Sequence, residues 1–166
     1  MREVVKIVGS TVVVLAAVLL LLSVTGFEPK DCPPTDRSLS CKVPGLWLKG
    51  ERVTSPVTDW SFTDQIPQIK IQTQTPFLLP HSVTIWCAAY NGNLYVTSAR
   101  GREWVEDMIR DPHVRLKIAD KVYDRTVSIV DDPAEKAAVL QARLRKYPQW
   151  KGPPDSALTV FRVNPA

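Results

Sequence analysis

The sequence predicts a mainly β (α+β) domain of six or seven strands and two helices, preceded by a single N-terminal transmembrane helix. Three observations predict this fold class. Residues 7–24 carry no charged side chain, several later segments alternate apolar and polar residues as half-buried strands do, and two segments place apolar residues at helical spacing. The chain has 166 residues, 45% of them hydrophobic and 23% charged, which is enough for one globular domain with an appendage.

The charge distribution argues against a nucleic-acid partner. The net charge is +4 and the isoelectric point is about 9.0. Between residues 100 and 125, however, the basic residues are interleaved with six acidic ones. This is typical of a solvated mixed face, because nucleic-acid-binding surfaces gather basic and aromatic residues in one stripe.

Residues 1–26 are predicted to be a membrane anchor, with the lipid bilayer as partner. The uncharged segment reaches the ~18 to 20 residues that cross a bilayer as a helix. A cleaved signal peptide usually has a shorter apolar region of ~7 to 15 residues, so we favour an uncleaved anchor. The residues before Cys32 are Pro29, Lys30 and Asp31, which do not fit a lipoprotein signal.

Residues 27–44 are polar and contain prolines, which is typical of a tether. Cys32 and Cys41 flank a short loop within it, and in an oxidising compartment they would form a disulfide. The alternative is two free thiols on a linker. Lys and Arg lie on both sides of the anchor and do not settle its orientation, so the cysteine pair is what favours a domain on the external (periplasmic) side.

Residues 45–166 are predicted to form the domain. Strands are expected at 46–49 and 69–75, and the aromatic segment 57–62 is expected to pack over one end of the core. Residues 83–90 are predicted to be one strand, which the Asn91-Gly92 turn joins to a second strand at 94–97.

A helix and a strand are expected next. Trp104, Val105, Met108 and Ile109 recur at helical spacing as one apolar face. Asp111-Pro112 is expected to end that helix, and residues 114–118 alternate as a strand.

The last part of the domain is predicted to contain a strand at 122–130, a helix and a final strand at 157–163. Asp132 is a natural N-cap, Pro133 suits the first helical position, and Glu135 is expected to complete a capping box with Asp132. Val139, Leu140 and Leu144 are expected to supply the packing face of this helix.

The segment between the second central strand and the first domain helix is the candidate site. Thr97, Ser98, Arg100 and Arg102 would meet the free N–H groups of a helix start, which suits a phosphate or carboxylate. The alternative is a solvated hairpin end. His81 and His113 are too far apart in the sequence for a zinc motif, so no metal site is expected.

The order of these elements resembles the split β-barrel family of flavin-binding proteins, which includes the pyridoxamine phosphate oxidase-like enzymes and the deazaflavin-dependent nitroreductases. Three runs of residues carry the resemblance: Pro80-His81-Ser82-Val83 before Ile85-Trp86, Leu94-Tyr95-Val96-Thr97-Ser98 before Arg100 and Arg102, and Arg110-Asp111-Pro112-His113-Val114-Arg115-Leu116.

The resemblance implies a homodimeric split β-barrel that binds FMN or a deazaflavin. It also implies a small-molecule ligand, namely a small organic acceptor to which the cofactor transfers electrons. It implies that Thr97, Ser98, Arg100 and Arg102 hold the cofactor phosphate, and that His81, Ser82 and Trp86 lie along the ring side. Many family members have Lys in the helix-start pattern where this chain has Gly101-Arg102. No catalytic side chain is assigned.

Two alternatives stay open. The domain could be a non-enzymatic binding or scaffold module at the membrane that has lost its cofactor, or a haem-binding barrel with His81 or His113 as axial ligand. Trp86 could be a barrel or interface aromatic residue, and Cys87 is expected to be a buried small hydrophobe.

Overall fold

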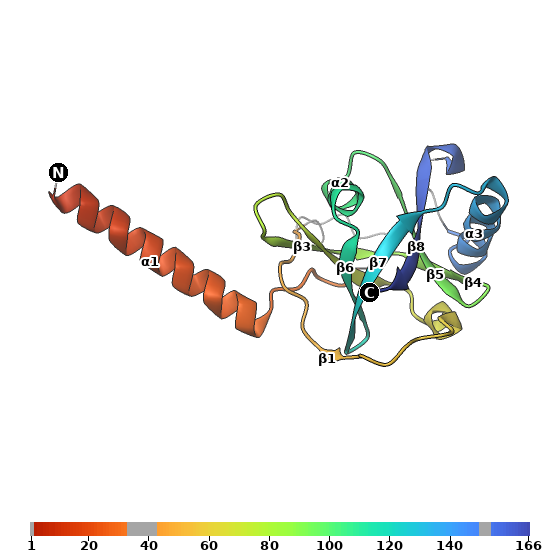
Figure 1. The fold of residues 1–166 in the computed structure, drawn as a ribbon, viewed down its shortest axis with the longest axis horizontal. Coiled ribbons are helices and arrows are strands. Elements are labelled where there is room, and N and C mark those ends of the chain that lie inside the picture. The colour runs from red at the N-terminus through yellow and green to blue at the C-terminus, as the bar shows by residue number, and fades with distance from the viewer. Residues whose placement is uncertain (1, 33–42, 150–153) are drawn as a thin grey trace.

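The computed structural model describes residues 2–32, 43–149 and 154–166, in which one long helix leads into a domain built on a single curled sheet (Figure 1). The helices are α1 (Arg2–Thr25), α2 (Glu103–Arg110) and α3 (Pro133–Lys146), with 3-10 turns η2 (Ser61–Gln65) and η3 (Asp155–Ala157). The strands are β1 (Glu51–Arg52), β2 (Ile69–Gln74), β3 (Pro80–Ile85), β4 (Cys87–Tyr90), β5 (Asn93–Ala99), β6 (His113–Ile118), β7 (Lys121–Ile129) and β8 (Leu158–Pro165).

The strand order explains why the sheet curls into a barrel that is split. It runs β3-β2-β6-β7-β8-β5-β4, with β1 added to β7, and all pairs except β1–β7 are antiparallel. The two edge strands, β3 and β4, are separated in sequence only by Trp86. The sheet must therefore bend until its two edges meet at this residue. The prediction of one strand over residues 83–90 was wrong, because β3 pairs with β2 whereas β4 pairs with β5.

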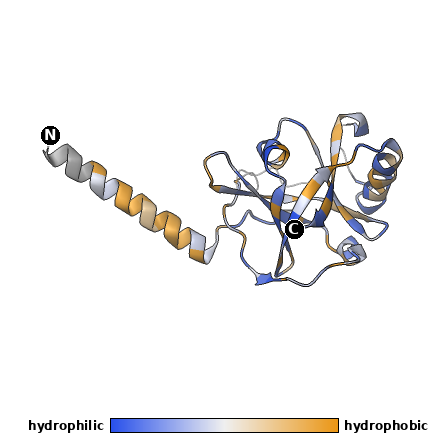
Figure 2. Cartoon of the chain, in the orientation of Figure 1, coloured by the Kyte–Doolittle hydropathy of each residue, from blue (hydrophilic) through white to orange (hydrophobic). Residues whose placement is uncertain are grey.

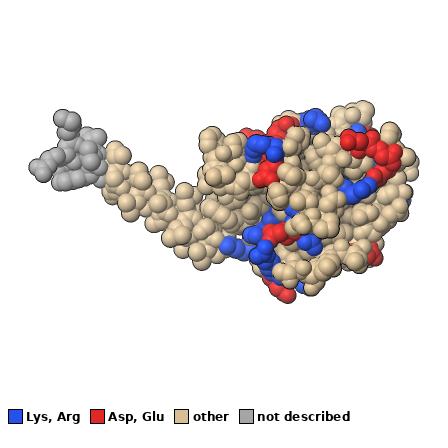
Figure 3. Space-filling model, viewed as in Figure 1, with Lys and Arg blue, Asp and Glu red and all other residues tan. Residues whose placement is uncertain are grey.

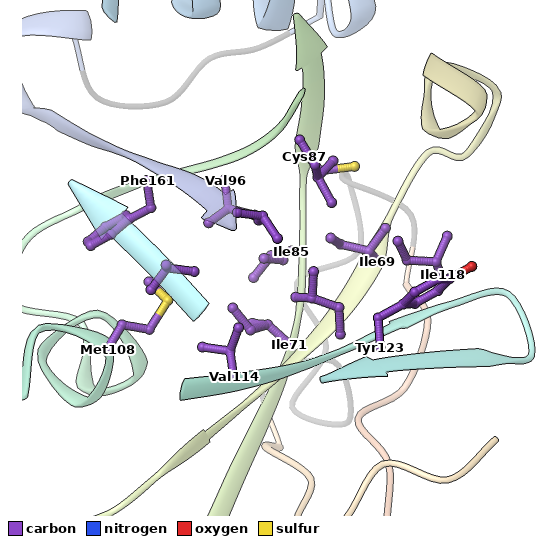
Figure 4. Close-up of a cluster of buried hydrophobic side chains, with 14 of the residues drawn as sticks. Ile69, Ile71, Ile85, Cys87, Val96, Met108, Val114, Ile118, Tyr123 and Phe161 are labelled. Atoms are coloured by element: carbon purple, nitrogen blue, oxygen red, sulfur yellow. The ribbon is translucent and has the colours of Figure 1, made fainter. Parts of the chain in front are cut away.

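The core fills the inside of the curled sheet (Figure 4). Ile71, Leu94, Val96 and Leu116 are fully buried there. They come from β2, β5 and β6, and each lies on the inward face that alternation along a strand provides. The free Cys87 thiol is buried in the same cluster, as predicted.

The two domain helices pack with faces slightly different from those predicted. Trp104, Val105 and Met108 of α2 are buried, but Ile109 is 40% exposed. In α3, Val139 and Leu140 are buried and Leu144 is 40% exposed, because the arginine at 143 takes the inward position. The helix boundaries at Asp111-Pro112 and before Pro148 are as predicted.

The start of α3 confirms one part of the predicted capping box. The Asp132 carboxylate accepts hydrogen bonds from the N–H groups of Ala134 and Glu135, at 3.2 and 3.1 Å, and Pro133 opens the helix. The Glu135 side chain does not complete the box. Its carboxylate accepts from the Tyr95 hydroxyl and the Arg162 guanidinium instead, because both groups lie beside it on the sheet.

The segment before β2 differs from the prediction at one point. No strand forms at 46–49. Gly45 makes an isolated bridge with Ser82 of β3, and β1 lies a few residues later. The aromatic segment behaves as expected, since Trp60 is buried and its ring packs edge-on against Tyr123 with centroids 5.3 Å apart.

The helix α1 extends away from the domain, and its apolar residues contrast with the mixed domain surface (Figures 2 and 3). The stretch Val8–Thr25 has a mean hydropathy of 2.5 and is long and apolar enough to cross a membrane. Cys32 takes part in a disulfide, while its expected partner Cys41 lies outside the described residues.

The chain after α1, which we call the neck (residues 26–32), packs directly on the sheet. The Phe27 N–H donates to the Trp47 carbonyl, and the Phe27 carbonyl accepts from Leu46. The Glu28 carboxylate forms ion pairs with Lys70 at 3.2 Å and Lys117 at 2.7 Å. These contacts hold the first part of the predicted tether against β2 and β6.

Candidate functional site

A cavity lies where the two edges of the sheet part. Strand β4 begins at Cys87, opposite Val96, so residues 97–99 of β5 pair with β8 only. On the other side of Trp86, β3 turns away to pair with β2. We call the resulting opening of about 210 Å³ the seam cavity. It is lined by Thr84, Ile85, Trp86, Thr97, Ser98, Ala99, Arg102, Trp104 and Leu158.

Four of the seven predicted site residues meet in this cavity, namely Trp86, Thr97, Ser98 and Arg102. They come from the β3–β4 junction, the end of β5 that has no β4 neighbour and the N-cap residue of α2. One cation, two hydroxyl groups and an indole thus line the same space. This combination can bind an anion that carries an aromatic group.

The start of α2 is less available to an anion than the sequence suggested. Arg102 is the N-cap residue and makes no side-chain capping bond. The Glu106 carboxylate, however, accepts a hydrogen bond from the Gly101 N–H at 2.9 Å, and Glu103 and Glu106 both lie in the first turn. Two carboxylates already complement the helix start, so they oppose the binding of a further negative charge there. An anion in the seam cavity would therefore depend mainly on the Arg102 guanidinium and the hydroxyl groups.

A second hollow of about 270 Å³ lies beside the seam cavity and beneath the neck, and we call it the neck cavity. The two share Thr84, Arg102 and Trp104. Lys30 lines the neck cavity, and its carbonyl accepts from the Thr84 hydroxyl at 3.3 Å. The neck thus adds a wall and a cation beside Arg102, which lines both hollows. We call the two adjacent hollows together the groove. No local pattern in the sequence assigned Lys30 or Thr84 to the site, although Thr84 shares a strand face with Trp86.

The other three predicted site residues lie elsewhere. Arg100 lines a separate hollow between β8 and the start of α3. The Ser82 side chain is fully buried beneath Gly45 and does not line the seam cavity. The His81 ring faces Asp107, with its Nδ1 atom 3.5 Å from the carboxylate. The Asp107 carboxylate also pairs with Arg110 at 2.8 Å.

Trp86 forms the wall between the seam cavity and a third hollow of about 520 Å³ near the end of α3. Its ring stacks on Tyr147, with centroids 4.4 Å apart and planes 12° from parallel. The Tyr147 hydroxyl lies 3.0 Å from the Cys87 carbonyl and 2.9 Å from the Pro67 carbonyl. Burial raises the pKa of this phenol, so Tyr147 stays neutral. Its ring supports the Trp86 ring from the side away from the seam cavity.

Comparison with known proteins supports the fold. No protein-family model matches the sequence, and no curated protein matches it. Among solved structures, one described as an F420 reductase superposes with a TM-score of 0.52 at 20% identity, covering 68% of this chain and 96% of that one. A putative pyridoxamine 5'-phosphate oxidase from Listeria innocua gives 0.50 at 16% identity, with coverages of 61% and 86%.

A third structure, described as a domain-swapped dimer, has a TM-score of 0.51 and 20% identity and covers 60% of this chain and 81% of that one. Similarity at this level of identity establishes architecture and leaves activity to be argued from the site. The chain has the split β-barrel fold of the pyridoxamine phosphate oxidase-like and F420 reductase structures, as the sequence resemblance implied.

Proposed function

We propose that this chain is a membrane-anchored oxidoreductase-like protein that binds FMN or a deazaflavin in the seam cavity and acts on a small organic acceptor. The observation that carries the proposal is the convergence of Arg102, Ser98 and Thr97 with two indole rings in one cavity. A guanidinium and hydroxyl groups suit a phosphate, and aromatic walls suit a planar ring system.

Each residue has a defined role in this proposal. Arg102 binds the cofactor phosphate as a charged donor, and Ser98 and Thr97 orient it with their hydroxyl groups. Trp86 and Trp104 exclude water from the ring. When bound, the cofactor supplies the electron-transfer chemistry, so no protein nucleophile is needed.

A second copy of the chain is part of the proposal. At about 210 Å³ the seam cavity is smaller than the ~300 to 1,000 Å³ of sites that enclose drug-sized ligands. The phosphate end of a cofactor fits such a volume better than a whole flavin does. We infer that a homodimer completes the site across the open side of the groove, and the structural similarity to a domain-swapped dimer supports this inference.

The membrane location is proposed from α1, and the external side from the disulfide at Cys32. A reporter enzyme that is active only outside the cytoplasm, fused after Ala166, tests the orientation. Activity of the fusion would support an external domain. A silent reporter in an inserted, full-length fusion would overturn it.

The decisive experiment is a titration of the full-length chain in detergent micelles with FMN and then with a deazaflavin, followed by absorbance and fluorescence. The full chain is required because Glu28 and Lys30 of the neck pack on the sheet. We expect Arg102→Ala to weaken binding about tenfold or more, and Arg102→Lys to recover part of the loss. Arg100→Ala is the matched control, since Arg100 lines a different hollow.

The second candidate is a cofactor-free binding or scaffold module. It is favoured by the hydrogen bond from Gly101 to Glu106, which occupies part of the helix start. If a folded sample binds neither cofactor, the oxidoreductase proposal fails and this module becomes the better explanation. If Arg100→Ala weakens binding as much as Arg102→Ala does, the seam cavity is not the phosphate site.

A further inference from the structure

The loop between β2 and β3 presents three consecutive apolar side chains to solvent. The exposed fractions of Phe77, Leu78 and Leu79 are 85%, 79% and 42%. Outside α1, Phe77 and Leu78 are the most exposed large hydrophobic residues in the described part of the chain. Single exposed apolar residues are common in soluble proteins, whereas a contiguous group usually marks an interaction surface.

The loop is held in a defined shape. The Thr75 N–H donates to the Leu79 carbonyl at 2.9 Å, the Thr75 hydroxyl donates to the same carbonyl at 2.8 Å, and the Leu78 N–H donates to the Thr75 carbonyl at 3.0 Å. These bonds close the turn from within and leave the apolar side chains pointing outward.

Leu78 is an unusual choice of residue for this turn. Its φ angle is +60°, in the left-handed region. The other described non-glycine residues with positive φ are Asn91 and Ala119, which have small or short polar side chains. A turn facing water would favour Gly or Asn at such a position, because these residues adopt it with little strain. A bulky leucine there indicates that its side chain serves a purpose outside the turn.

The loop lies on the side of the domain from which α1 extends (Figure 1). The neck joins α1 to the segment 45–47 through the backbone bonds of Phe27, and Gly45 in turn bridges Ser82 of β3. Leu79 is three residues before Ser82, a span of about 10 Å along a strand. Figures 1 and 2 show the apolar tip of this loop on the side of the domain from which α1 extends.

The composition around the loop suits a lipid surface. Residues 75–82 contain no Asp or Glu. The Arg110 side chain, 42% exposed, donates to the Gln74 carbonyl at the base of the loop and also pairs with the buried Asp107 carboxylate, which leaves part of the guanidinium open to solvent. An apolar tip with a cation at its base matches the order of acyl chains and phosphates at a membrane interface.

We propose that Phe77, Leu78 and Leu79 insert into the interface of the bilayer that α1 spans, as a second membrane contact of the domain. The proposal goes beyond the redox function and needs only the membrane anchor. Interfacial segments of this kind bury their apolar face about 5 to 10 Å deep. With two contacts, the domain is fixed in orientation over the membrane and cannot rotate freely about the neck.

The test uses full-length L78C, labelled with an environment-sensitive fluorophore and reconstituted in phosphatidylcholine vesicles that contain lipids brominated at defined acyl positions. F77C provides a second probe if L78C does not fold. Because Cys87 is buried and Cys32 is in a disulfide, we expect the label to react with the introduced thiol. L15C, in the middle of α1, and D131C, before α3 at the far end of the domain, are the matched controls (Figure 1).

We expect shallow bromines to quench the label at 78 about twofold or more, as befits a residue within the interface. Deep bromines should quench the label at 15, and neither lipid should quench the label at 131.

Quenching at 15 without quenching at 78 or 77 overturns the loop proposal and leaves the anchor intact. No quenching at 15 overturns the anchor and the loop proposal together. A blue-shifted label at 78 that lipids do not quench, and whose shift disappears on dilution, would identify a second copy of the chain as the occupant and also overturn the proposal.

Discussion

The two halves of β5 differ in strand pairing and surroundings, although they belong to one strand. Tyr95 and Val96 lie between β4 and β8, Leu94 pairs with β4, and all three are almost completely buried. Thr97 and Ser98 follow without interruption, but β4 no longer lies beside them, and both line the seam cavity. The first half belongs to the core, and the second half lines the cavity in which we propose the site.

The cause of this difference is the single residue at which the sheet edges separate. Because Trp86 lies between the end of β3 and the start of β4, β4 pairs with β5 only as far as Cys87, and the sheet edges part beyond it. The residue types follow the same division, with apolar residues where pairing is complete and hydroxyl groups where it stops. A break in strand pairing therefore positions polar side chains along a cavity without a dedicated loop.

The largest expected effect is in the paired half. Leu94→Ala should lower the free energy of unfolding by about 3 kcal/mol or more, because Leu94 is fully buried and the substitution leaves a cavity. Urea denaturation of the full-length chain in detergent micelles, followed by tryptophan fluorescence, measures this. A loss below about 1 kcal/mol would mean that the core closes easily around position 94 and that the paired half of β5 is not a tightly packed part of the core.

Much of this division follows from the sequence, and the break itself does not. Period-two alternation predicted most of the long strands, and the Asn91-Gly92 turn predicted the β4–β5 hairpin. Residues 83–90 contain no glycine, proline or other turn residue, so nothing local indicates that Trp86 passes from one sheet edge to the other. Strand pairing is decided by tertiary contacts that a single strand does not encode.

The site residues divide in the same way. Arg102 and Ser98 were predicted from the chemistry of a strand end and a helix start. Ser82 was carried over from the resemblance and lies under Gly45, away from the seam cavity. Lys30 was missed because it reaches the groove only through the packing of the neck on the sheet.

Tyr147 hydrogen-bonds to Cys87, the residue at which the pairing of β4 with β5 begins. Tyr147→Phe should cost about 1 to 2 kcal/mol in unfolding free energy, because the hydroxyl links Pro67 to the backbone of Cys87. The stacking on Trp86 is retained in this variant. Amide hydrogen exchange at Cys87 and Ala88 should accelerate more than exchange in β6. Equal acceleration in both strands would mean that Tyr147 stabilises the whole domain and not the seam in particular.

The opposite wall of the groove depends on the neck. Burial raises the pKa of the Glu28 carboxyl, but hydrogen bonds from Lys117, the Lys49 N–H and Lys70 outweigh this, and the pKa lies below its ordinary value of 4.5. A lowered folded-state pKa stabilises the protein above the unfolded value, and this contribution is lost as the pH falls through the folded value.

Glu28→Gln should therefore reduce stability by about 1 kcal/mol at neutral pH and by progressively less below pH 4.5. Unfolding curves of E28Q and of the original protein at several pH values give the difference in unfolding free energy. The contributions of the other carboxylates are the same in both proteins and cancel in this difference. Asp31→Asn is the control, since Asp31 is 72% exposed where it pairs with Lys70 and should contribute little. A difference between E28Q and the original protein that does not change with pH would contradict the role of the carboxylate charge.

The smallest effect on stability is expected in the open half of β5. The Ser98 hydroxyl donates to the Ala99 carbonyl at 3.2 Å, and Ser98→Ala removes this one bond and no apolar area. The unfolding free energy should change by less than about 1 kcal/mol, while the affinity for FMN, if the proposed site is correct, should fall several-fold because an anion loses a donor. The same two measurements on Leu94→Ala should give the reverse ranking. If Ser98→Ala destabilises the domain as much as Leu94→Ala does, the open half of β5 is core after all, and the division of the strand into a structural and a functional half is wrong.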